Sequence, residues 1–257
     1  MSPFPRGTVS LERALSKLGV ASRGEARRLI AEGRVSVDGQ LVRAPLQAVN
    51  PDRARIEVDG ARVRKATAVV LMMHKPAGIV TTRADERGRR TVTDLLPKDA
   101  PFVAPVGRLD LDSSGLLLLT NDSRLADQVT APGTCAKVYE VEVDRPLTDE
   151  VCARFRAGMT LQGGERLAPV EIAVDPTRPT HARLTLHEGR NRQIRRMCGE
   201  TGYAVVTLHR VTIGPLSLDD LAVGAVRALS ATEEKALRAA VEPPRRGRRA
   251  TSSRPGS

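Results

Sequence analysis

The sequence has few cysteines and no long apolar run, and both absences narrow the kind of protein it can be. Its three cysteines, Cys135, Cys152 and Cys198, are widely spaced and form no C-x-x-C pair. This pattern excludes a disulfide framework and the usual zinc-ligand spacings, so we expect reduced thiols that mostly fill space in the core. No stretch approaches the roughly 18 apolar residues that a membrane-spanning helix needs.

Signals for export and for bound cofactors are also missing. Residues 1–7 carry one Arg and no apolar segment of the kind found in secretory signals. The chain has no glycine-rich phosphate-binding loop, no dinucleotide fingerprint and no Cys/His cluster. We therefore expect a soluble, cytoplasmic, monomeric protein that needs neither a metal nor an organic cofactor.

Negative charge is in short supply, and the positive excess is unevenly distributed. The 257 residues include 41 Lys and Arg against 30 Asp and Glu, a net charge of +11. Residues 1–65 hold 13 basic and 7 acidic side chains, and residues 241–257 hold 5 and 1. The excess points to a polyanionic partner, nucleic acid or an anionic membrane, and its position favours nucleic-acid-binding ends around a neutral body. The alternative explanation of the excess, mainly for the tail, is a genome that favours Arg in all its proteins.

Local patterns near the N-terminus predict two helices followed by a hairpin. Apolar residues recur at helical spacing over Leu11–Lys17. Ser22–Glu25 matches a capping box, whose hydroxyl and carboxylate satisfy free backbone donors at the start of a second helix. Gly33 ends that helix, and residues 35–39 then alternate into an Asp-Gly turn, which is typical of a strand entering a hairpin.

The rest of the sequence mixes strand-like and helix-like patterns without an internal repeat. Strands are predicted at 69–73, 79–82, 138–143, 170–174, 181–186 and 205–211, and helices at 125–129, 149–155, 192–199 and 232–241. We therefore predict an α+β fold with a small helix-helix-hairpin domain followed by a mixed, largely antiparallel-sheet domain. The predicted parts are a first domain at 8–57, a linker at 58–68, a second domain at 69–240 and a basic disordered tail at 241–257.

The most specific stretch is residues 106–122, in which Gly107 and Gly115 bracket a charged loop that leads into four consecutive leucines. Arg108 and Asp110 should thus lie at the mouth of a buried strand, where loops often carry function. From the residues alone, an Arg-x-Asp pair is more often a structural salt bridge than a catalytic pair.

Several segments resemble known families. LSKLGVASRGEARRLIAEGRVSVDGQLV resembles the S4 RNA-binding domain, over about residues 8–57. Four further segments, HKPAGIVTT, GRLDLDSSGLLLLTND, KVYEV and EGRNRQIRRMC, are similar, in order, to motifs of the RsuA/RluB/RluE/RluF family of ribosomal RNA pseudouridine synthases. His74 stands where Asn is commoner in that family, a departure that leaves the catalytic assignment untouched.

The resemblance implies an isomerase that converts a uridine of ribosomal RNA, in the large subunit, into pseudouridine. Asp110 would be the catalytic carboxylate; whether it attacks C1′, adds to C6 or removes the C2′ proton stays open, and Asp112 would be a loop or capping residue. Tyr139 would stack on the flipped uracil and serve in proton transfer. The alternative is that Tyr139 only packs in the core of the sheet. Arg195 would pair with Asp110, keeping it ionised and oriented.

Basic side chains from both domains are expected to contact the RNA. They are Arg13, Arg23, Arg27, Arg28, Lys75, Arg108, Arg190, Arg192 and Arg196. For the clustered arginines, the alternative is a solvent-exposed helix face without RNA. Arg108 resembles the residue that helps to fill the space left by the flipped base. Lys75 has a purely structural role as its alternative. The rival functions are a non-catalytic ribosome-assembly factor and a synthase that acts on small-subunit or transfer RNA.

Overall fold

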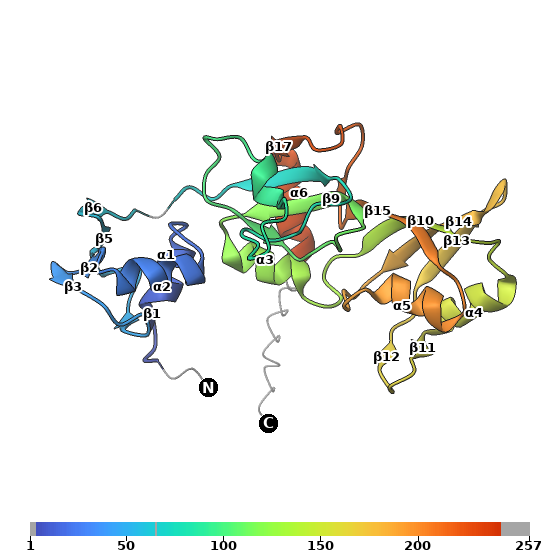
Figure 1. Ribbon diagram of the computed structural model, residues 1–257, viewed down its shortest axis with the longest axis horizontal. Coiled ribbons are helices and arrows are strands. Elements are labelled where there is room, and N and C mark those ends of the chain that lie inside the picture. The colour runs from blue at the N-terminus through green and yellow to red at the C-terminus, as the bar shows by residue number, and fades with distance from the viewer. Residues whose placement is uncertain (1–3, 65, 243–257) are drawn as a thin grey trace, which may run out of the picture.

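The computed structural model shows a small N-terminal domain followed by the two halves of a larger domain (Figure 1). The structure describes residues 4–64 and 66–242, so the tail predicted at 241–257 lies outside the described residues from position 243 onward. The α+β fold with a largely antiparallel sheet is confirmed. None of the described helices is long and apolar enough to cross a membrane.

The N-terminal domain packs two helices against short strands. It contains β1 (Val9–Ser10), α1 (Leu11–Lys17), α2 (Arg23–Ala31), β2 (Val35–Val37), β3 (Gln40–Leu41), β4 (Ala48–Val49), β5 (Ile56–Val58) and β6 (Ala61–Arg62). The Ser22 hydroxyl accepts a hydrogen bond from the Glu25 amide at 3.1 Å, as the predicted cap requires. Gly33 follows α2 with φ of 73°, in the left-handed region that a helix end of this kind favours. Leu15 and Ile30 lie in the core between these elements.

The N-terminal sheet extends further than predicted. Its strand order is β3-β2-β5-β6, so part of the segment predicted as a linker at 58–68 belongs to this sheet. These strands are short and polar, so their sequence pattern did not predict them. Asp59-Gly60 has φ of 51° and 76° and repeats the Asp-Gly turn of residues 38–39. The connection between the domains therefore begins after Arg62.

The second domain is built on one nine-stranded sheet. Its path is β13-β14-β10-β15-β9-β7-β17, with β16 beside β15 and β8 beside β9. The strands are β7 (Val70–Lys75), β8 (Ala104–Val106), β9 (Ser114–Thr120), β10 (Lys137–Val143), β13 (Glu171–Asp175), β14 (Arg178–Leu186), β15 (Val205–Ile213), β16 (Leu216–Ser217) and β17 (Val226–Ala228). Every paired neighbour in this sheet is antiparallel except β9 with β15.

Helices cover both halves of this sheet, and each half has its own core. The helical elements are η1 (Val92–Leu95), α3 (Ser123–Thr130), α4 (Asp149–Ala157), α5 (Gln193–Glu200) and α6 (Ala231–Val241), and a separate hairpin pairs β11 (Met159–Thr160) with β12 (Arg166–Leu167). Phe155 of α4 and Met197 of α5 belong to the core of one half. Leu125 of α3 and Leu237 of α6 belong to the core of the other.

The strand predicted at 79–82 is wrong. The structure has only an isolated bridge between Val80 and Thr91 in this segment. Ile79 is buried, and the Thr81 hydroxyl donates a hydrogen bond to the Leu109 carbonyl at 2.7 Å. These β-branched residues therefore support a loop instead of forming a ladder.

The two halves of the sheet meet at a glycine. β15 and β9 pair at His209 with Ser114 and at Arg210 with Gly115. A Cβ atom on Gly115 would lie 2.2 Å from the Arg210 carbonyl oxygen and 2.5 Å from the Arg210 nitrogen. Backbone atoms cannot yield at such distances, and Gly115 also has φ of 110°, so the junction requires glycine.

We predict that Gly115→Ala destabilises the second domain strongly, by about 3 kcal/mol or more, because the methyl group collides with backbone. The matched control is Gly199→Ala in α5, where an added Cβ meets nothing within 4 Å and helix propensity should raise stability by up to about 1 kcal/mol. Urea unfolding followed by circular dichroism measures both variants. Equal stability of Gly115→Ala and the wild type would contradict the argument.

Candidate active site

The site is built on the loop between β8 and β9, and a buried lysine supports this loop from below. Lys75 is 0% exposed, and its Nζ donates to the carbonyl oxygens of Pro76 at 3.0 Å, Asp110 at 3.1 Å and Ser113 at 2.7 Å. Burial lowers the pKa of Lys75 to about 8, and the charges of Asp112 and Asp110 oppose this shift. The ammonium therefore keeps its three donors at neutral pH.

Two arginines from the start of α5 face the two carboxylates of this loop. Arg192 Nη1 lies 3.4 Å from Asp110 Oδ2 and 3.4 Å from Asp112 Oδ1. Arg195 Nη2 lies 3.2 Å from Asp112 Oδ2, while Arg195 Nε lies 3.9 Å from Asp110 Oδ2. The residue expected to pair with Asp110 thus stands closer to Asp112, and Arg192, expected at a phosphate, stands between both carboxylates.

Asp110 and Asp112 differ in what holds them. The Asp112 side chain is 50% exposed, and its backbone carbonyl accepts a hydrogen bond from Arg195 Nη2 at 3.2 Å. The Asp110 side chain is 24% exposed, and its only close partners in the described chain are the two guanidinium groups on Oδ2. Its second oxygen, Oδ1, is therefore left for a ligand.

Tyr139 is joined to a buried arginine. In β10, Tyr139 pairs with Arg210 of β15, and Arg210 Nη1 donates to the Tyr139 hydroxyl at 3.4 Å. Arg210 is 3% exposed and also donates from Nε to the Leu116 carbonyl at 2.8 Å. A guanidinium can only donate, so the hydroxyl proton of Tyr139 must point elsewhere.

Sequence reasoning missed Arg210, although a signal for it existed. Leu208 and Arg210 are both buried at alternate positions of β15, so Arg210 interrupts the inward-facing set of that strand. A charged residue at such a position is rarely tolerated unless it is held by hydrogen bonds, which makes it a candidate for support of a site.

These residues line a small pocket of about 70 Å³. Its walls are Arg108, Leu109, Asp110, Ser113, Tyr139, Leu186, Glu188, Gly189, Arg190, Arg192, Gln193, Ile194 and Leu208. The other carboxylate in this wall, Glu188, accepts from the Ala168 amide at 2.9 Å and from Gln193 Nε2 at 2.9 Å, and Arg190 Nε approaches it at 3.4 Å. Glu188 therefore orders the turn before α5, and Asp110 is the carboxylate presented to the pocket.

The remaining residues expected to contact RNA fall into two groups. Arg13, Arg23 and Arg108 are exposed. Arg28 and Arg190 are exposed as well but have acidic neighbours, Glu32 (Nε to Oε1, 3.9 Å) and Glu188 (Nε to Oε2, 3.4 Å). Arg27 is exposed but pairs with Glu12 of α1 (Nη2 to Oε1, 3.2 Å), and Arg196 Nη1 lies 2.5 Å from Glu165 Oε2. Lys75 requires a correction, because a fully buried ammonium with three backbone acceptors supports the loop and does not reach RNA.

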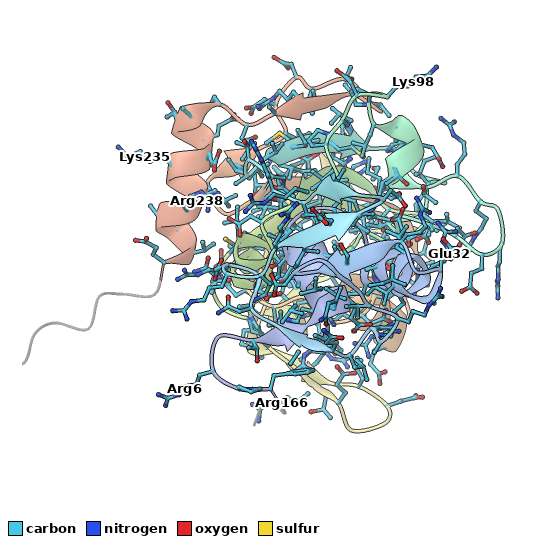
Figure 2. All side chains as sticks on the ribbon, turned by 90° about the vertical axis from the view of Figure 1, so that its left-hand side faces the viewer. Arg6, Glu32, Lys98, Arg166, Lys235 and Arg238 are labelled. Atoms are coloured by element: carbon cyan, nitrogen blue, oxygen red, sulfur yellow. The ribbon has the colours of Figure 1, made fainter. Side chains whose placement is uncertain are left out.

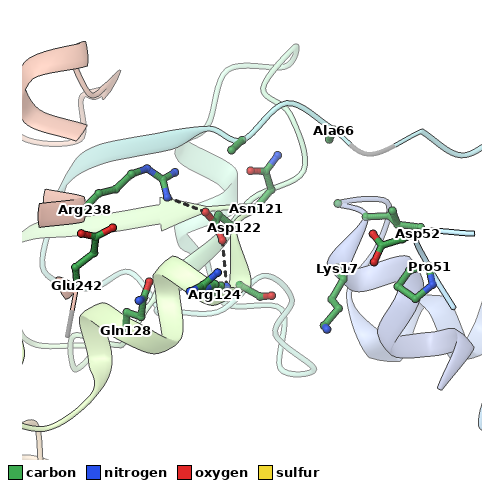
Figure 3. Close-up of a pocket in the computed structure, with 14 residues that line it drawn as sticks. Lys17, Pro51, Asp52, Ala66, Asn121, Asp122, Arg124, Gln128, Arg238 and Glu242 are labelled. Atoms are coloured by element: carbon green, nitrogen blue, oxygen red, sulfur yellow. Dashed lines mark hydrogen bonds and ion pairs between the residues drawn. The ribbon is translucent and has the colours of Figure 1, made fainter. Parts of the chain in front are cut away.

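A second cavity, of about 720 Å³, lies away from this site, between the two domains (Figure 3). Its carboxylate Asp122 is already bonded to Arg238 Nη1 at 3.1 Å and to the first amides of α3. Asn121 binds the connecting segment, since its side chain accepts from the Val69 amide and donates to the Thr67 carbonyl, both at 2.9 Å. These contacts tie Asn121 to the segment that connects the domains and occupy the Asp122 carboxylate.

The described residues contain no group of three or more His, Cys, Asp or Glu side chains that could hold a metal ion. The three cysteines are free and buried. Burial raises the pKa of Cys198 to about 12, which removes it as a nucleophile at neutral pH.

Known proteins resemble this chain over most of its length. Residues 69–200 match the RNA pseudouridylate synthase family, and residues 10–52 match the S4 domain. Ribosomal large subunit pseudouridine synthase B of Bacillus subtilis (strain 168) is 37% identical over 234 residues, covering 89% of this chain and 95% of that protein. Ribosomal small subunit pseudouridine synthase A of Pseudomonas aeruginosa is 39% identical over 227 residues, covering 87% and 97%.

A solved structure extends this similarity to the fold. The crystal structure of a pseudouridylate synthase aligns with a TM-score of 0.66 at 27% identity, covering 89% of this chain and 99% of that chain. The similarity in sequence and in fold therefore includes both domains.

We predict that Lys75→Met lowers the free energy of unfolding by about 1–3 kcal/mol, because three loop carbonyls lose their donor. Turnover should fall with it, while affinity for RNA and its salt dependence should stay close to those of the wild type. Denaturant unfolding and RNA binding at several salt concentrations measure the two effects separately. A weaker salt dependence with unchanged stability would restore the role of Lys75 as an RNA contact.

Proposed function

This chain is a member of the RNA pseudouridylate synthase family with an N-terminal S4 domain, and we propose that it isomerises a specific uridine of large-subunit ribosomal RNA with Asp110 as its catalytic carboxylate. One observation carries the assignment of Asp110. The Asp110 carboxylate lines the same pocket as Tyr139, and its Oδ1 has no partner among the described residues. We further propose that the protein acts as a monomer in the cytoplasm.

The reaction needs a group beside the ribose and the base, because the N-glycosidic bond breaks and C5 of the uracil then bonds to C1′. A carboxylate can act there as nucleophile or as base. Arg192 and Arg195 orient Asp110 from one side through charge-assisted contacts, and both leave Oδ1 open. Attack at C1′, addition at C6 and removal of the C2′ proton all fit this geometry.

The uridine must leave the RNA stack to reach Asp110, since a stacked base hides its reactive atoms. Tyr139 stacks on the extruded uracil in our proposal, and its hydroxyl proton, directed away from Arg210, is available to the base. Arg108 is exposed at the pocket mouth and fills the space that the base vacates. No redox cofactor enters this scheme, because the isomerisation transfers no electrons overall.

A ribosomal RNA target is supported by the names of two relatives, and these names differ in the subunit. The Bacillus subtilis protein supports a large-subunit target, which we propose, and the Pseudomonas aeruginosa protein supports a small-subunit target as the second candidate. A non-catalytic assembly factor is disfavoured, because such a protein has no need for Asp110, Tyr139 and Arg195 around one pocket.

We predict that Asp110→Asn lowers turnover by on the order of 10²–10⁴-fold or more, because it removes the reacting charge and keeps the shape. Asp112→Asn is the matched control and should retain most activity, since its backbone contact to Arg195 survives. Tritium release from RNA containing 5-labelled uridine measures both variants, and RNA binding should persist in each. An active Asp110→Asn with an inactive Asp112→Asn would reverse the assignment.

The target is tested by mapping pseudouridines in ribosomal and transfer RNA from cells with and without this protein. We expect one site in 23S RNA to be unmodified when the protein is absent, and to be restored by the wild type but not by Asp110→Asn. Loss of a site in 16S RNA would establish the second candidate instead. An unchanged map would contradict the proposed function.

A further inference from the structure

Arg210 differs from every other arginine that the structure describes. Figure 2, with the N-terminal domain toward the viewer, shows charged side chains on every side, including Lys235 and Arg238 at one edge and Glu32 at the other. Arginines at the surface are therefore ordinary in this protein. Arg210 is the only arginine among the described residues that is buried, at 3% exposed, and a cation in such a place requires a physical reason.

The stability of the fold gives only part of that reason. The Arg210 guanidinium donates from Nε to the Leu116 carbonyl at 2.8 Å and from Nη1 to the Tyr139 hydroxyl at 3.4 Å. Its remaining nitrogen, Nη2, is buried and has no hydrogen-bond partner among the described residues. Because an unsatisfied buried donor costs free energy, we expect a side chain kept for stability alone to satisfy all three nitrogens.

The surroundings of Arg210 are also unfavourable for a cation. Arg210 lies within electrostatic reach of two other buried cations, Lys75 and Lys137. Burial lowers the pKa of each lysine, and the positive charge of Arg210 lowers both further. An apolar side chain of similar length at position 210 would avoid this repulsion, so stability alone does not explain the arginine.

A shift in strand register brings Arg210 to Tyr139. Val138 of β10 pairs with Thr212 of β15. The next residue, Tyr139, pairs with Arg210, so the register skips Val211. A β-bulge of this kind re-aims side chains and is common beside active sites. Without the shift, Val211 would stand opposite Tyr139, and the phenol oxygen would lose its donor.

From these contacts we infer that Arg210 is the positioning residue of Tyr139, which holds the phenol oxygen in place and directs the hydroxyl proton into the pocket. The inference rests on the proposed function, in which this proton serves the extruded uracil. A guanidinium can only donate, so the phenol oxygen must accept from it and the hydroxyl proton lies on the other side. Tyr139 lines the pocket and Arg210 does not, so Arg210 acts on the reaction through Tyr139.

The first test is a double-mutant cycle in the full chain with Arg210→Met and Tyr139→Phe. Single-turnover tritium release is measured at saturating transcripts of 23S and 16S RNA that contain 5-labelled uridine. We expect Arg210→Met to lower the rate by on the order of 10²-fold, because a displaced reacting group costs about this much, and to leave the affinity for RNA unchanged. Tyr139→Phe removes the hydroxyl, so Arg210→Met should add no further loss in that background.

Losses that multiply in the double variant would overturn the inference, because Arg210 would then act independently of the Tyr139 hydroxyl. Arg156→Met is the matched control. Arg156 Nη2 also donates to a strand carbonyl, that of Ile172 at 3.0 Å, and neither residue lines the pocket, so the rate should not change. Equal slowing by Arg156→Met and Arg210→Met would also overturn the inference.

A second measurement needs neither RNA nor turnover. The chain has two tyrosines and no tryptophan, so Tyr203→Phe leaves Tyr139 as its one tyrosine. Near-ultraviolet circular dichroism then reports how firmly the Tyr139 ring is held, and Arg210→Met in this background should weaken the tyrosine signal. An undiminished signal would show that Arg210 does not position the ring.

Far-ultraviolet circular dichroism checks that each variant is folded. Arg210→Lys replaces Arg210→Met in both measurements if the latter does not fold, because it keeps the charge but lacks the fork that reaches both Leu116 and Tyr139. The ring signal is recorded without substrate, so its result is independent of tritium release by the wild type, which tests the proposed function.

Discussion

The close approach of two backbones at Gly115 and Arg210 is the contact on which the candidate active site depends. Asp110 precedes β9, and Tyr139 belongs to β10, which pairs with β15 and not with β9. The two residues can face one pocket only if β9 and β15 lie side by side, and these strands pair at just two positions. A side chain at position 115 would separate them, so one missing methyl group controls the distance between residues far apart in the sequence.

Cations bonded to backbone carbonyls hold the site together. Lys75 binds three carbonyl oxygens, two of them in the loop between β8 and β9. Arg195 binds the carbonyls of Asp112 and Val205, and Arg210 binds that of Leu116. A buried charge is tolerated when several dipoles surround it. Carbonyl partners have a further advantage here, because a carboxylate partner for each cation would place more negative charge beside Asp110 and the RNA.

Sequence patterns predicted the parts of the fold that depend on neighbouring residues. The cap at Ser22 and the helix end at Gly33 depend only on neighbouring residues. In each case the local backbone requires that residue type, a hydroxyl acceptor at Ser22 and a positive φ at Gly33. The parallel contact of β9 with β15 joins residues 95 positions apart, and no periodicity encodes such a pairing. The strand expected at 79–82 failed for a related reason, since β-branched residues also suit a buried loop when a distant carbonyl, that of Leu109, accepts the hydroxyl of Thr81.

The arginines around α5 mark the limit of what sequence could predict about the site. Arg190, Arg192, Arg195 and Arg196 are close in sequence, and their composition predicts one basic surface. The structure gives them different partners: Arg190 approaches Glu188, Arg192 and Arg195 share the two loop carboxylates, and Arg196 pairs with Glu165. Which arginine meets which acid depends on φ of 47° at Arg192, which turns the chain into α5, and on tertiary contacts that the sequence does not display.

Acidic side chains near the expected RNA path are paired with arginines, as the negative charge of the substrate requires. An exposed carboxylate repels a phosphate backbone, and salt reduces this repulsion only beyond about 8 Å at physiological ionic strength. Asp110 and Asp112 are covered by Arg192 and Arg195. The same screening means that the net charge of +11 cannot direct RNA to the pocket from a distance. Basic residues must instead stand along the expected RNA path itself, on α2 and around the pocket.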